Sequence, residues 1–360
     1  MSDQLLINVL KQAAESGASD VHITAGDRVF VRRCGRLESG EEFFSAETAE
    51  FFCHFDRIIG EKALRTWKEH HEIDLSFEIA AVPQWRFRLN GYWSMGKPAA
   101  AIRLVTRTIP EPEELGFPPL LKQLSLRRQG LILITGPSGS GKSTTLASLV
   151  QWLSRQEPLH IITLEDPVEY RFDSRSCLIH QRQIGDDAAG FPDGVIASLR
   201  EDPDVLCVGE LREHATIGAA LTAAETGHLV LATLHASDAP RAIDRVVDAF
   251  PAQQRELARA QLALTLTAVC AQTLLPSGGA RFAVFELLTA SSAVVSAIRE
   301  GKTALLKSMI QTGGRDGMVS FEASLARLVA TGAVSAELAS RYVSDPAELA
   351  RLVRRERGAQ

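Results

Sequence analysis

The chain has 360 residues, of which 45% are hydrophobic and 23% are charged. This is enough apolar material for more than one hydrophobic core, so we expect two or three domains. The formal net charge of −5 argues against a chain that binds nucleic acid through its overall charge. No apolar run reaches about 18 residues, which predicts no membrane span. The N-terminus has no basic or long apolar region, so we also predict no signal peptide.

Residues 1–108 are predicted to form a small α+β domain. Apolar residues at helical spacing cover residues 4–15, and alternating patterns predict strands in DVHIT, RVFVRR, IDLSFEI and WRFRLNGYW. The segment IPEPEELGFPP then places four prolines in eleven residues, a composition that interrupts helices and central strands. We therefore predict a Pro-rich linker over residues 109–128.

Residues 129–289 are predicted to form a doubly wound α/β domain. Short apolar strands, GLILIT, HIITLE, DVLCVGE and HLVLATLH, alternate with helical patterns, as expected for a parallel sheet covered on both faces. FAVFELL is a candidate for a further strand, and the apolar stretch around Cys270 is interpreted as helical. From residue 290 to residue 360 the pattern is helical throughout.

The cysteines are scattered and form no C-x-x-C pair. They are Cys34, Cys53, Cys177, Cys207 and Cys270. This usage is typical of a reduced, intracellular protein, and we expect Cys207 and Cys270 to be buried apolar residues.

The clearest motif is GPSGSGKST, which lies between the strand LILIT and the helix STTLASLVQWLS. A strand, the pattern G-x-x-x-x-G-K-[ST] and a helix together predict a phosphate-binding loop, because the backbone N–H groups of the loop face the phosphates. Lys142 is expected to contact the β- and γ-phosphates, and the Ser143 hydroxyl to bind Mg²⁺. The motif thus predicts a site for ATP and Mg²⁺ formed by Gly136, Pro137, Ser138, Gly139, Ser140, Gly141, Lys142, Ser143 and Thr144.

Carboxylates follow the next two predicted strands. Glu165 ends HIITLE and Asp166 follows it, at the strand end where ligands bind in open parallel sheets, and both are candidate Mg²⁺ ligands. The alternative is an ordinary polar turn. Glu210 ends DVLCVGE and is a candidate for orienting the water that attacks the γ-phosphate. Its alternative is a salt bridge to Arg212. The preceding position, where such strands often carry Asp, is Gly209.

Two histidines flank the strand LVLATL. His228 precedes it and His235 ends it, so only His235 is expected at the same edge as Lys142 and Glu210. A histidine there can donate a hydrogen bond to the γ-phosphate. A purely structural role is the open alternative for either residue.

Several long segments together resemble the type IV pilus retraction ATPases, the PilT family of the type II/IV secretion ATPases. These are GASDVHITAG, GPSGSGKSTTLASL, LEDPVEY, LREDPDVLCVGELR, TAAETGHLVLATLHASDA and AIDRVVDAFP. The resemblance runs from about Ala18 to beyond residue 330. It implies a PAS-like α+β N-terminal domain, a RecA-like core with a P-loop, and a helical C-terminal region.

The resemblance also implies an activity and partners. Members are cytoplasmic homohexamers that hydrolyse ATP and drive pilus retraction through an inner-membrane platform protein, in some cases beside a paralogous pilus ATPase. It assigns Glu210 and Glu165 to catalysis and His228, with His235, to the nucleotide site. It further implies that Arg88, Arg103 and Arg107 reach a neighbouring subunit's nucleotide. The alternative is that these arginines lie on a solvated strand face or form ordinary interface ion pairs.

Two departures from the family pattern leave the role of the chain open. The family segment AIRNLIRE is AVVSAIRE here, with Val295 in place of an arginine, which leaves open an accessory ring subunit with little hydrolysis of its own. An assembly or secretion ATPase and a DNA-transfer motor also stay open, although the tetracysteine zinc motif usual in assembly ATPases is missing. Direct nucleic-acid binding is not expected.

Overall fold

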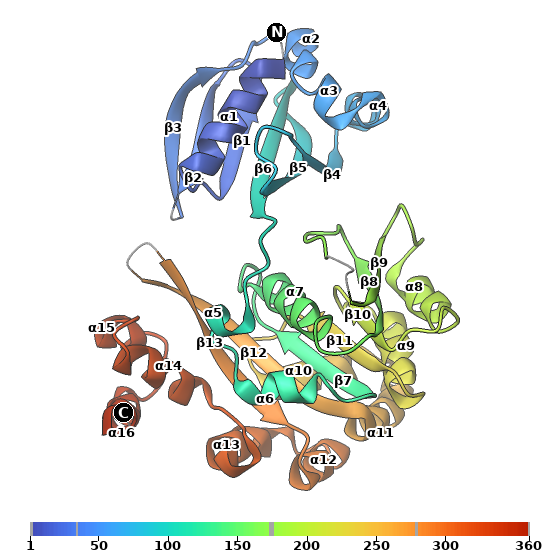
Figure 1. Cartoon of the computed structure of the whole chain (residues 1–360), viewed down its shortest axis with the longest axis vertical. Helices are drawn as coiled ribbons and strands as arrows, with labels where there is room; N and C mark the ends of the chain where they lie inside the picture. The colour runs from blue at the N-terminus through green and yellow to red at the C-terminus, as the bar shows by residue number, and fades with distance from the viewer. Residues whose placement is uncertain (1–2, 34, 173–175, 278–279, 359–360) are drawn as a thin grey trace. The chain divides into compact units, whose positions relative to one another are not determined.

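The computed structural model describes residues 3–33, 35–172, 176–277 and 280–358, so Cys34 lies outside the described residues. The chain divides into two compact units (Figure 1). Unit 1 is Met1–Thr108 with Glu169–Arg171, and unit 2 is Ile109–Val168 with Phe172–Gln360. In the part of the chain that is described, no helix combines the length and apolarity needed to cross a bilayer.

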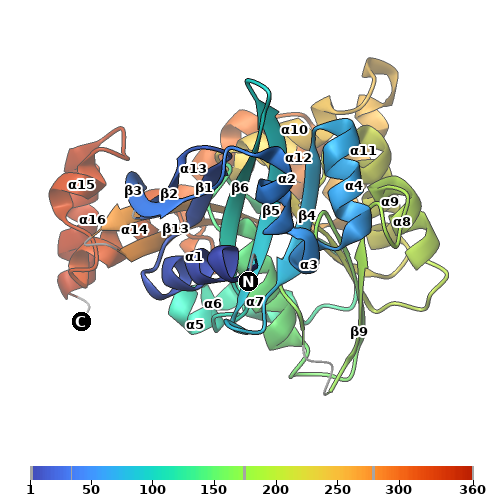
Figure 2. The ribbon, with the colours of Figure 1, turned by 90° about the horizontal axis from the view of Figure 1, so that it is seen from above.

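Unit 1 is built on an antiparallel sheet whose described strands have the order β3-β2-β1-β6-β5-β4. The helices pack beside this sheet, with α1 along β1 and α4 beside β4 (Figures 1 and 2). The strands are β1 (Asp20–Thr24), β2 (Arg28–Arg33), β3 (Arg36–Phe43), β4 (Ile73–Glu78), β5 (Trp85–Ser94) and β6 (Lys97–Thr106). The helices are α1 (Asp3–Glu15), α2 (Thr48–Cys53), α3 (Asp56–Ile59) and α4 (Glu61–His70).

The core of unit 1 is centred on an aromatic cluster. The fully buried Trp67 ring meets Phe51, Phe52 and Phe55 edge-on, with ring centroids 6.1, 5.1 and 5.2 Å away, a geometry that aromatic quadrupoles favour. On β5, a Cβ at Gly91 would lie 2.4 Å from the Trp67 ring. Only glycine therefore lets the sheet approach this ring without a shift.

Unit 2 contains a mainly parallel sheet with the described order β13-β12-β7-β11-β10-β8-β9. Among the strands that the structure describes, only β13 runs antiparallel to its neighbour. The strands are β7 (Gly130–Thr135), β8 (His160–Glu165), β9 (Leu178–Gln183), β10 (Val205–Val208), β11 (Leu229–Leu234), β12 (Leu266–Ser277) and β13 (Ala280–Thr289). The helices are α5 (Pro112–Leu115), α6 (Pro119–Leu124), α7 (Lys142–Leu153), α8 (Phe191–Ser198), α9 (His214–Glu225), α10 (Ala239–Asp248), α11 (Arg255–Thr265), α12 (Ser292–Arg299), α13 (Leu306–Thr312), α14 (Phe321–Ala330), α15 (Ala336–Ser340) and α16 (Pro346–Gly358).

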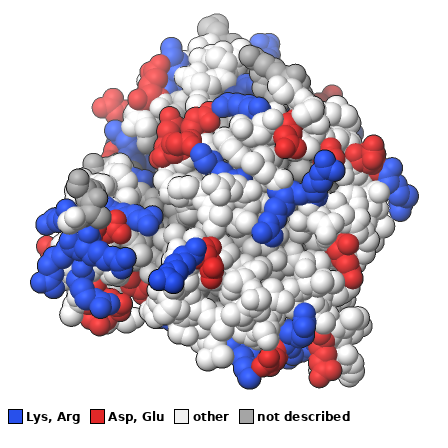
Figure 3. Space-filling model, turned by 60° about the horizontal axis from the view of Figure 1, so that its bottom comes forward, with Lys and Arg blue, Asp and Glu red and all other residues white. Residues whose placement is uncertain are grey.

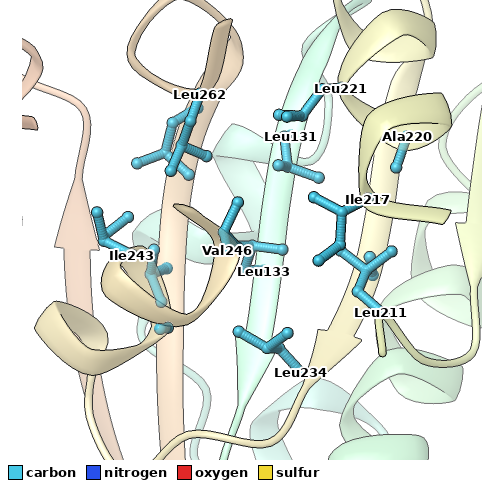
Figure 4. Close-up of a cluster of buried hydrophobic side chains, with 14 of the residues drawn as sticks. Leu131, Leu133, Leu211, Ile217, Ala220, Leu221, Leu234, Ile243, Val246 and Leu262 are labelled. Atoms are coloured by element: carbon cyan, nitrogen blue, oxygen red, sulfur yellow. The ribbon is translucent and has the colours of Figure 1, made fainter. Parts of the chain in front are cut away.

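Helices cover both faces of this sheet, as the continuous apolar strands predict. Every residue of β7 and β11 is buried, the pattern of strands packed on two sides. One face packs against α8 to α13, where Leu131, Ile217, Val246 and Leu262 belong to one hydrophobic cluster (Figure 4). The other face packs against α5, α6 and α7. The described helices thus cover the two faces of the sheet, whereas the edge at the carboxyl ends of its strands is not covered by them.

The apolar stretch around Cys270 is a strand, so its interpretation as helical was wrong. Helix α11 ends at Thr265, Leu266 takes an extended conformation (φ −60°, ψ 130°), and β12 follows. The stretch is rich in Thr, Val and Leu and is buried along most of its length. A short apolar run that is buried on both faces shows neither the helical nor the strand period of hydrophobic residues. Here its pairing with β7 and β13 makes it a strand.

Residues 109–128, predicted as a linker, are packed onto the core of unit 2. Pro112 and Pro119 each stand at the first turn of a short helix, a position that proline tolerates. Phe117 and Leu121 are buried in the same cluster as α7. Unit 2 also continues through residues 290–360: α12 and α13 join the main core, while α14 and α16 form a smaller one.

Figure 3 shows charges of both signs on one face, with basic side chains gathered at the left.

Candidate functional site

A tight glycine-rich loop joins β7 to α7 at the carboxyl edge of the parallel sheet. The loop runs from Gly136 to Gly141, and α7 begins at Lys142. Gly139 and Gly141 have φ angles of 75° and 87°, in the left-handed region that glycine adopts readily. The backbone N–H groups of such a loop and of the first helical turn have no partner inside the helix, so they can bind an anion.

Three side chains from separate segments meet beside this loop. Lys142 Nζ lies 3.0 Å from Gly136 O and 3.5 Å from His235 Nδ1. His235 Nε2 lies 3.0 Å from Glu210 Oε1, and the other oxygen of Glu210 lies 2.8 Å from Arg212 Nη2. The predicted meeting of Lys142, Glu210 and His235 is therefore found. The alternative for Glu210 is found as well, since it bridges His235 and Arg212.

The hydrogen bonds of His235 assign its protonation. Burial, followed by the charge of Lys142, lowers the pKa of His235 below its ordinary value, although Glu210 acts in the opposite sense. The Glu210 carboxylate only accepts, so the ring proton lies on Nε2 and the Nδ1 lone pair faces the Lys142 ammonium. The neutral imidazole of His235, after β11, thus links Lys142, after β7, to the Glu210 carboxylate, after β10.

The parallel register brings these segments together. Leu234 of β11 lies beside Thr135 of β7, and Val208 of β10 lies beside Leu164 of β8. Since parallel strands all end at the same edge, the segments that follow them emerge side by side.

The acidic segment after β8 lies at the same edge. Glu165 Oε1 accepts hydrogen bonds from Thr163 Oγ1 (2.7 Å) and Gln181 Nε2 (3.0 Å). The hydrogen bond with Glu210 raises the pKa of Arg212 above its ordinary value, and the charge of Asp166 adds a small contribution in the same direction. Two donors therefore orient Glu165, and Asp166 acts electrostatically on the Glu210–Arg212 pair.

The glycine before Glu210 is required by the packing of β8 and β10. Gly209 N donates to Leu164 O (2.8 Å), and Thr233 Oγ1 donates to Gly209 O. A Cβ at Gly209 would lie 2.9 Å from Leu164 O and 3.4 Å from Glu165 Cα, closer than a backbone atom tolerates without a shift. An aspartate at this position would therefore force the two strands apart.

Comparison with known proteins agrees with this architecture. The family model described as type II/IV secretion system protein matches residues 2–282. The chain is 40% identical to the type IV pilus retraction ATPase PilT of Pseudomonas aeruginosa over 342 residues, which cover 95% of this chain and 98% of that protein. This chain belongs to the PilT family of type II/IV secretion system proteins. It is also 33% identical to the type IV pilus ATPase PilU of the same organism, over 96% of this chain and 90% of that protein.

A solved structure of the PilT family has the same fold. The crystal structure of the pilus retraction motor PilT with bound ADP matches with a TM-score of 0.84 at 40% identity, covering 95% of this chain and 98% of that chain. The predicted fold class is confirmed: a PAS-like α+β N-terminal domain, a RecA-like core and a helical C-terminal region.

The predicted magnesium ligands fit a site that nucleotide phosphates complete. Among the described residues, no group of three or more His, Cys, Asp or Glu side chains is placed to hold a metal ion alone. Mg²⁺ in nucleotide enzymes is usually held by one or two protein oxygens together with phosphates and waters. The exposed Ser143 at the start of α7 and the carboxylates of Glu165 and Asp166 supply oxygens of this kind.

His228 lies away from the glycine-rich loop, at the opposite end of β11. Its Nδ1 lies 3.1 Å from Ala223 O at the end of α9, and its backbone oxygen accepts from Gly130 N at the start of β7. The full length of β7 separates Gly130 from the loop. Within this chain the His228 ring lies at the end of α9 and is not brought to the loop, so its assignment to the nucleotide site stays a prediction.

The three predicted arginines lie in unit 1, and each has a carboxylate partner there. Arg88 Nη1 lies 2.6 Å from Glu169 Oε1, and Arg103 Nε lies 3.0 Å from Asp20 Oδ1. Arg107 Nη1 lies 3.2 Å from Glu78 Oε2. Within the chain these arginines thus form ordinary ion pairs, as the alternative interpretation expected. Their role toward a nucleotide stays a prediction.

Residues that the sequence did not single out complete the site. Thr163 and Gln181 orient Glu165, and Gln272 of β12 contacts the glycine-rich loop. None of these belongs to a motif with fixed spacing from the loop. Thr163 precedes Glu165 on β8 itself, whereas the pairing of β8 with β9 brings Gln181 to the site and the pairing of β12 with β7 brings Gln272.

Proposed function

We propose that this chain is a homohexameric motor that hydrolyses ATP with Mg²⁺ and drives retraction of type IV pili. The observation that carries the proposal is the hydrogen-bonded series Lys142, His235 and Glu210 beside the glycine-rich loop. It links the lysine proposed to hold the phosphates to the carboxylate proposed to orient the attacking water, and both roles recur in enzymes that transfer a phosphoryl group to water.

Each residue of this series has a distinct task. The loop N–H groups and Lys142 hold the β- and γ-phosphates of ATP. Glu210 orients the attacking water and accepts its proton, while Arg212 and His235 fix the carboxylate from two sides. Neutral His235 changes partners when phosphate charge arrives near Lys142, which links the state of the nucleotide to Glu210.

Ser143, Glu165 and Asp166 are the residues that would hold Mg²⁺. The ion would neutralise phosphate charge as it develops in the transition state. Thr163 and Gln181 keep the Glu165 carboxylate directed by donating to one of its oxygens.

The direction of the motor and its partners are inferred from the relatives. PilT of Pseudomonas aeruginosa is named a retraction ATPase, and a protein 42% identical to this chain over 286 residues is named a twitching motility protein. We propose a cytoplasmic ring that acts at the inner face of the inner membrane on a pilus platform protein. The arginines of unit 1, Arg88, Arg103 and Arg107, would exchange their carboxylate partners for the nucleotide of a neighbouring subunit.

The test is deletion of the gene followed by complementation. Deletion should leave excess surface pili and no twitching, and the wild-type chain should restore both. A chain with Glu210→Gln should fail to restore them while it still assembles as a ring. Loss of surface pili after deletion would contradict retraction and indicate an assembly motor.

A second candidate function is an accessory ring subunit with little hydrolysis of its own. Val295 in α12 favours it, because this half-buried residue packs an apolar side chain against the main core of unit 2 at the position where the family pattern has an arginine. Steady-state hydrolysis by the purified chain separates the two candidates. Nucleotide binding without turnover, alone and with a paralogous pilus ATPase, would support the accessory role.

A further inference from the structure

Gln272 lies directly behind the glycine-rich loop. The parallel register places Ala271 of β12 beside Thr135, the last residue of β7, so Gln272 comes level with Gly136. A Cβ at Gly136 would lie 2.4 Å from Gln272 O, and one at Gly141 would lie 3.0 Å from Gln272 Nε2. The first and last glycines of the loop therefore pack against this one residue.

Both ends of the Gln272 amide are used. Nε2 donates to Ser140 O (2.6 Å), and Oε1 accepts from Thr145 Oγ1 (2.7 Å). A carbonyl oxygen can only accept, so the NH₂ group must face Ser140 and the amide orientation is fixed. Gln272, Ser140 and Thr145 are all buried, at 3%, 3% and 1% exposure. Hydrogen bonds in such surroundings are costly to lose, because water cannot replace the missing partner.

These two bonds act on different parts of the loop. In a planar trans peptide, the carbonyl of one residue and the N–H of the next point in opposite directions. Since the Ser140 carbonyl points at Gln272, the N–H of Gly141 points away from it, toward the open side of the loop. The bond from Thr145, in the first turn of α7, holds the helix start in register with the same side chain.

We infer that Gln272 is a positioning residue for nucleotide binding, holding the glycine-rich loop and the first turn of α7 in their phosphate-binding arrangement. This inference rests on the proposed function, because it assumes that the loop binds the phosphates of ATP. Gln272 acts through the backbone of Ser140 and the hydroxyl of Thr145, and it has no direct part in the chemistry. A side chain with only a donor could bond Ser140 O alone, and one with only an acceptor could bond the Thr145 hydroxyl alone.

The test uses the full-length chain with Gln272→Met, which keeps the length of the side chain and removes both hydrogen bonds. Gln261→Met is the matched control, because Gln261 lies on α11 and its side chain donates an exposed hydrogen bond to Glu225 at the end of α9. Thr145→Val removes one of the two bonds. The measurements are the Kd for ADP by titration calorimetry, KM and kcat for ATP, and the melting temperature without nucleotide.

We expect Gln272→Met to raise both the Kd for ADP and the KM for ATP roughly tenfold, with kcat changed less than about threefold. Thr145→Val should raise them by roughly threefold. The double variant should be no worse than Gln272→Met, because the Thr145 hydroxyl and Gln272 share one bond. Gln261→Met should bind as the wild type does.

Two results would overturn the assignment. Gln272→Met with wild-type affinity at a temperature where it is folded would remove the positioning role, even if the variant melts earlier. Fully multiplicative effects in the double variant would show that Gln272 does not act through Thr145. A wild-type chain that binds no nucleotide would overturn the proposed function together with this inference, so the two failures are told apart by the wild type.

Discussion

The two sheets of this chain arrange their charged residues in opposite ways. In unit 2, the parallel strands bring Lys142, His235 and Glu210 to one edge, where they contact one another. In unit 1, the antiparallel pairing of β5 and β6 sets Arg88 directly opposite Arg103, and each arginine contacts a carboxylate of its own. Like charges opposite each other destabilise a sheet unless such partners offset them.

The difference follows from strand direction. A parallel sheet gathers residues that are far apart in the sequence, because all its strands end at one edge. An antiparallel sheet displays every second residue of neighbouring strands on a common face. The residues of unit 2 can therefore act together on one ligand, whereas the arginines of unit 1 form separate pairs that a competing anion could replace one at a time.

The largest expected effect is loss of turnover at the edge of the parallel sheet. Glu210→Gln should lower kcat for ATP by about 10²-fold or more, since a positioned carboxylate contributes at least this much to proton transfer, while the Kd for ADP stays within about threefold. Arg212→Gln removes only one of the two contacts that fix this carboxylate, and Arg212 is 72% exposed, so we expect it to lower kcat less than Glu210→Gln does. An equal loss in both variants would mean that the ion pair, and not the carboxylate, carries the activity.

A buried carboxylate of the same sheet should make stability depend on pH. Burial raises the pKa of Glu286 to about 7, and its Oε1 accepts from Ala239 N. Because the folded-state pKa is raised, the folded state favours the protonated form, and its stabilising effect is lost as pH rises through about 7. Glu286→Gln should match the wild type near pH 4, below the ordinary pKa of a carboxyl group, and exceed its unfolding free energy by up to about 3 kcal/mol at pH 8. Urea unfolding at both pH values measures this; a pH-independent difference would contradict it.

Two tightly packed glycines allow a direct comparison of the sheets. A Cβ at Gly209 would meet the backbone oxygen of Leu164, and a Cβ at Gly91 would meet the ring of Trp67. Each change to Ala should cost about 1–3 kcal/mol of unfolding free energy, because a well-packed site must shift. Only Gly209→Ala should also lower kcat, since Glu210 is its neighbour. Equal kcat values for the two folded variants would show that the strand spacing at Gly209 does not matter for hydrolysis.

The smallest expected effect on stability lies in unit 1. The Arg103 side chain is 65% exposed in its pair with Asp20, so Arg103→Gln should change the unfolding free energy by less than about 1 kcal/mol. The proposed role toward a neighbouring nucleotide predicts that Arg103→Gln lowers kcat and that Asp20→Asn, which breaks the same pair, does not. Equal turnover in both variants would leave Arg103 as an ordinary ion pair.

Local patterns predicted β7, β8, β10 and β11 of the parallel sheet and the meeting of residues at its edge. Lys142, Glu210 and His235 each follow or end an apolar strand, and the rule for parallel sheets then places them together. The same reasoning missed β3 and β9, which are largely polar, and β6, whose run of alanines has low strand propensity. It assigned β12 to a helix because a doubly buried run has no clear period. It also treated residues 109–128 as a linker, because prolines that interrupt long helices can begin short ones.

By itself, the sequence determined which residues can carry chemistry, because the glycine-rich loop and its lysine are contiguous and their geometry is local. The tertiary structure alone decided which distant residues support them. Gln272 reaches the loop through the register of β12 on β7, and Arg88 faces Arg103 through the register of β5 on β6. It also placed His228 at the far end of β11 from the loop. Strand register depends on packing summed over the whole sheet, and no short segment encodes that sum.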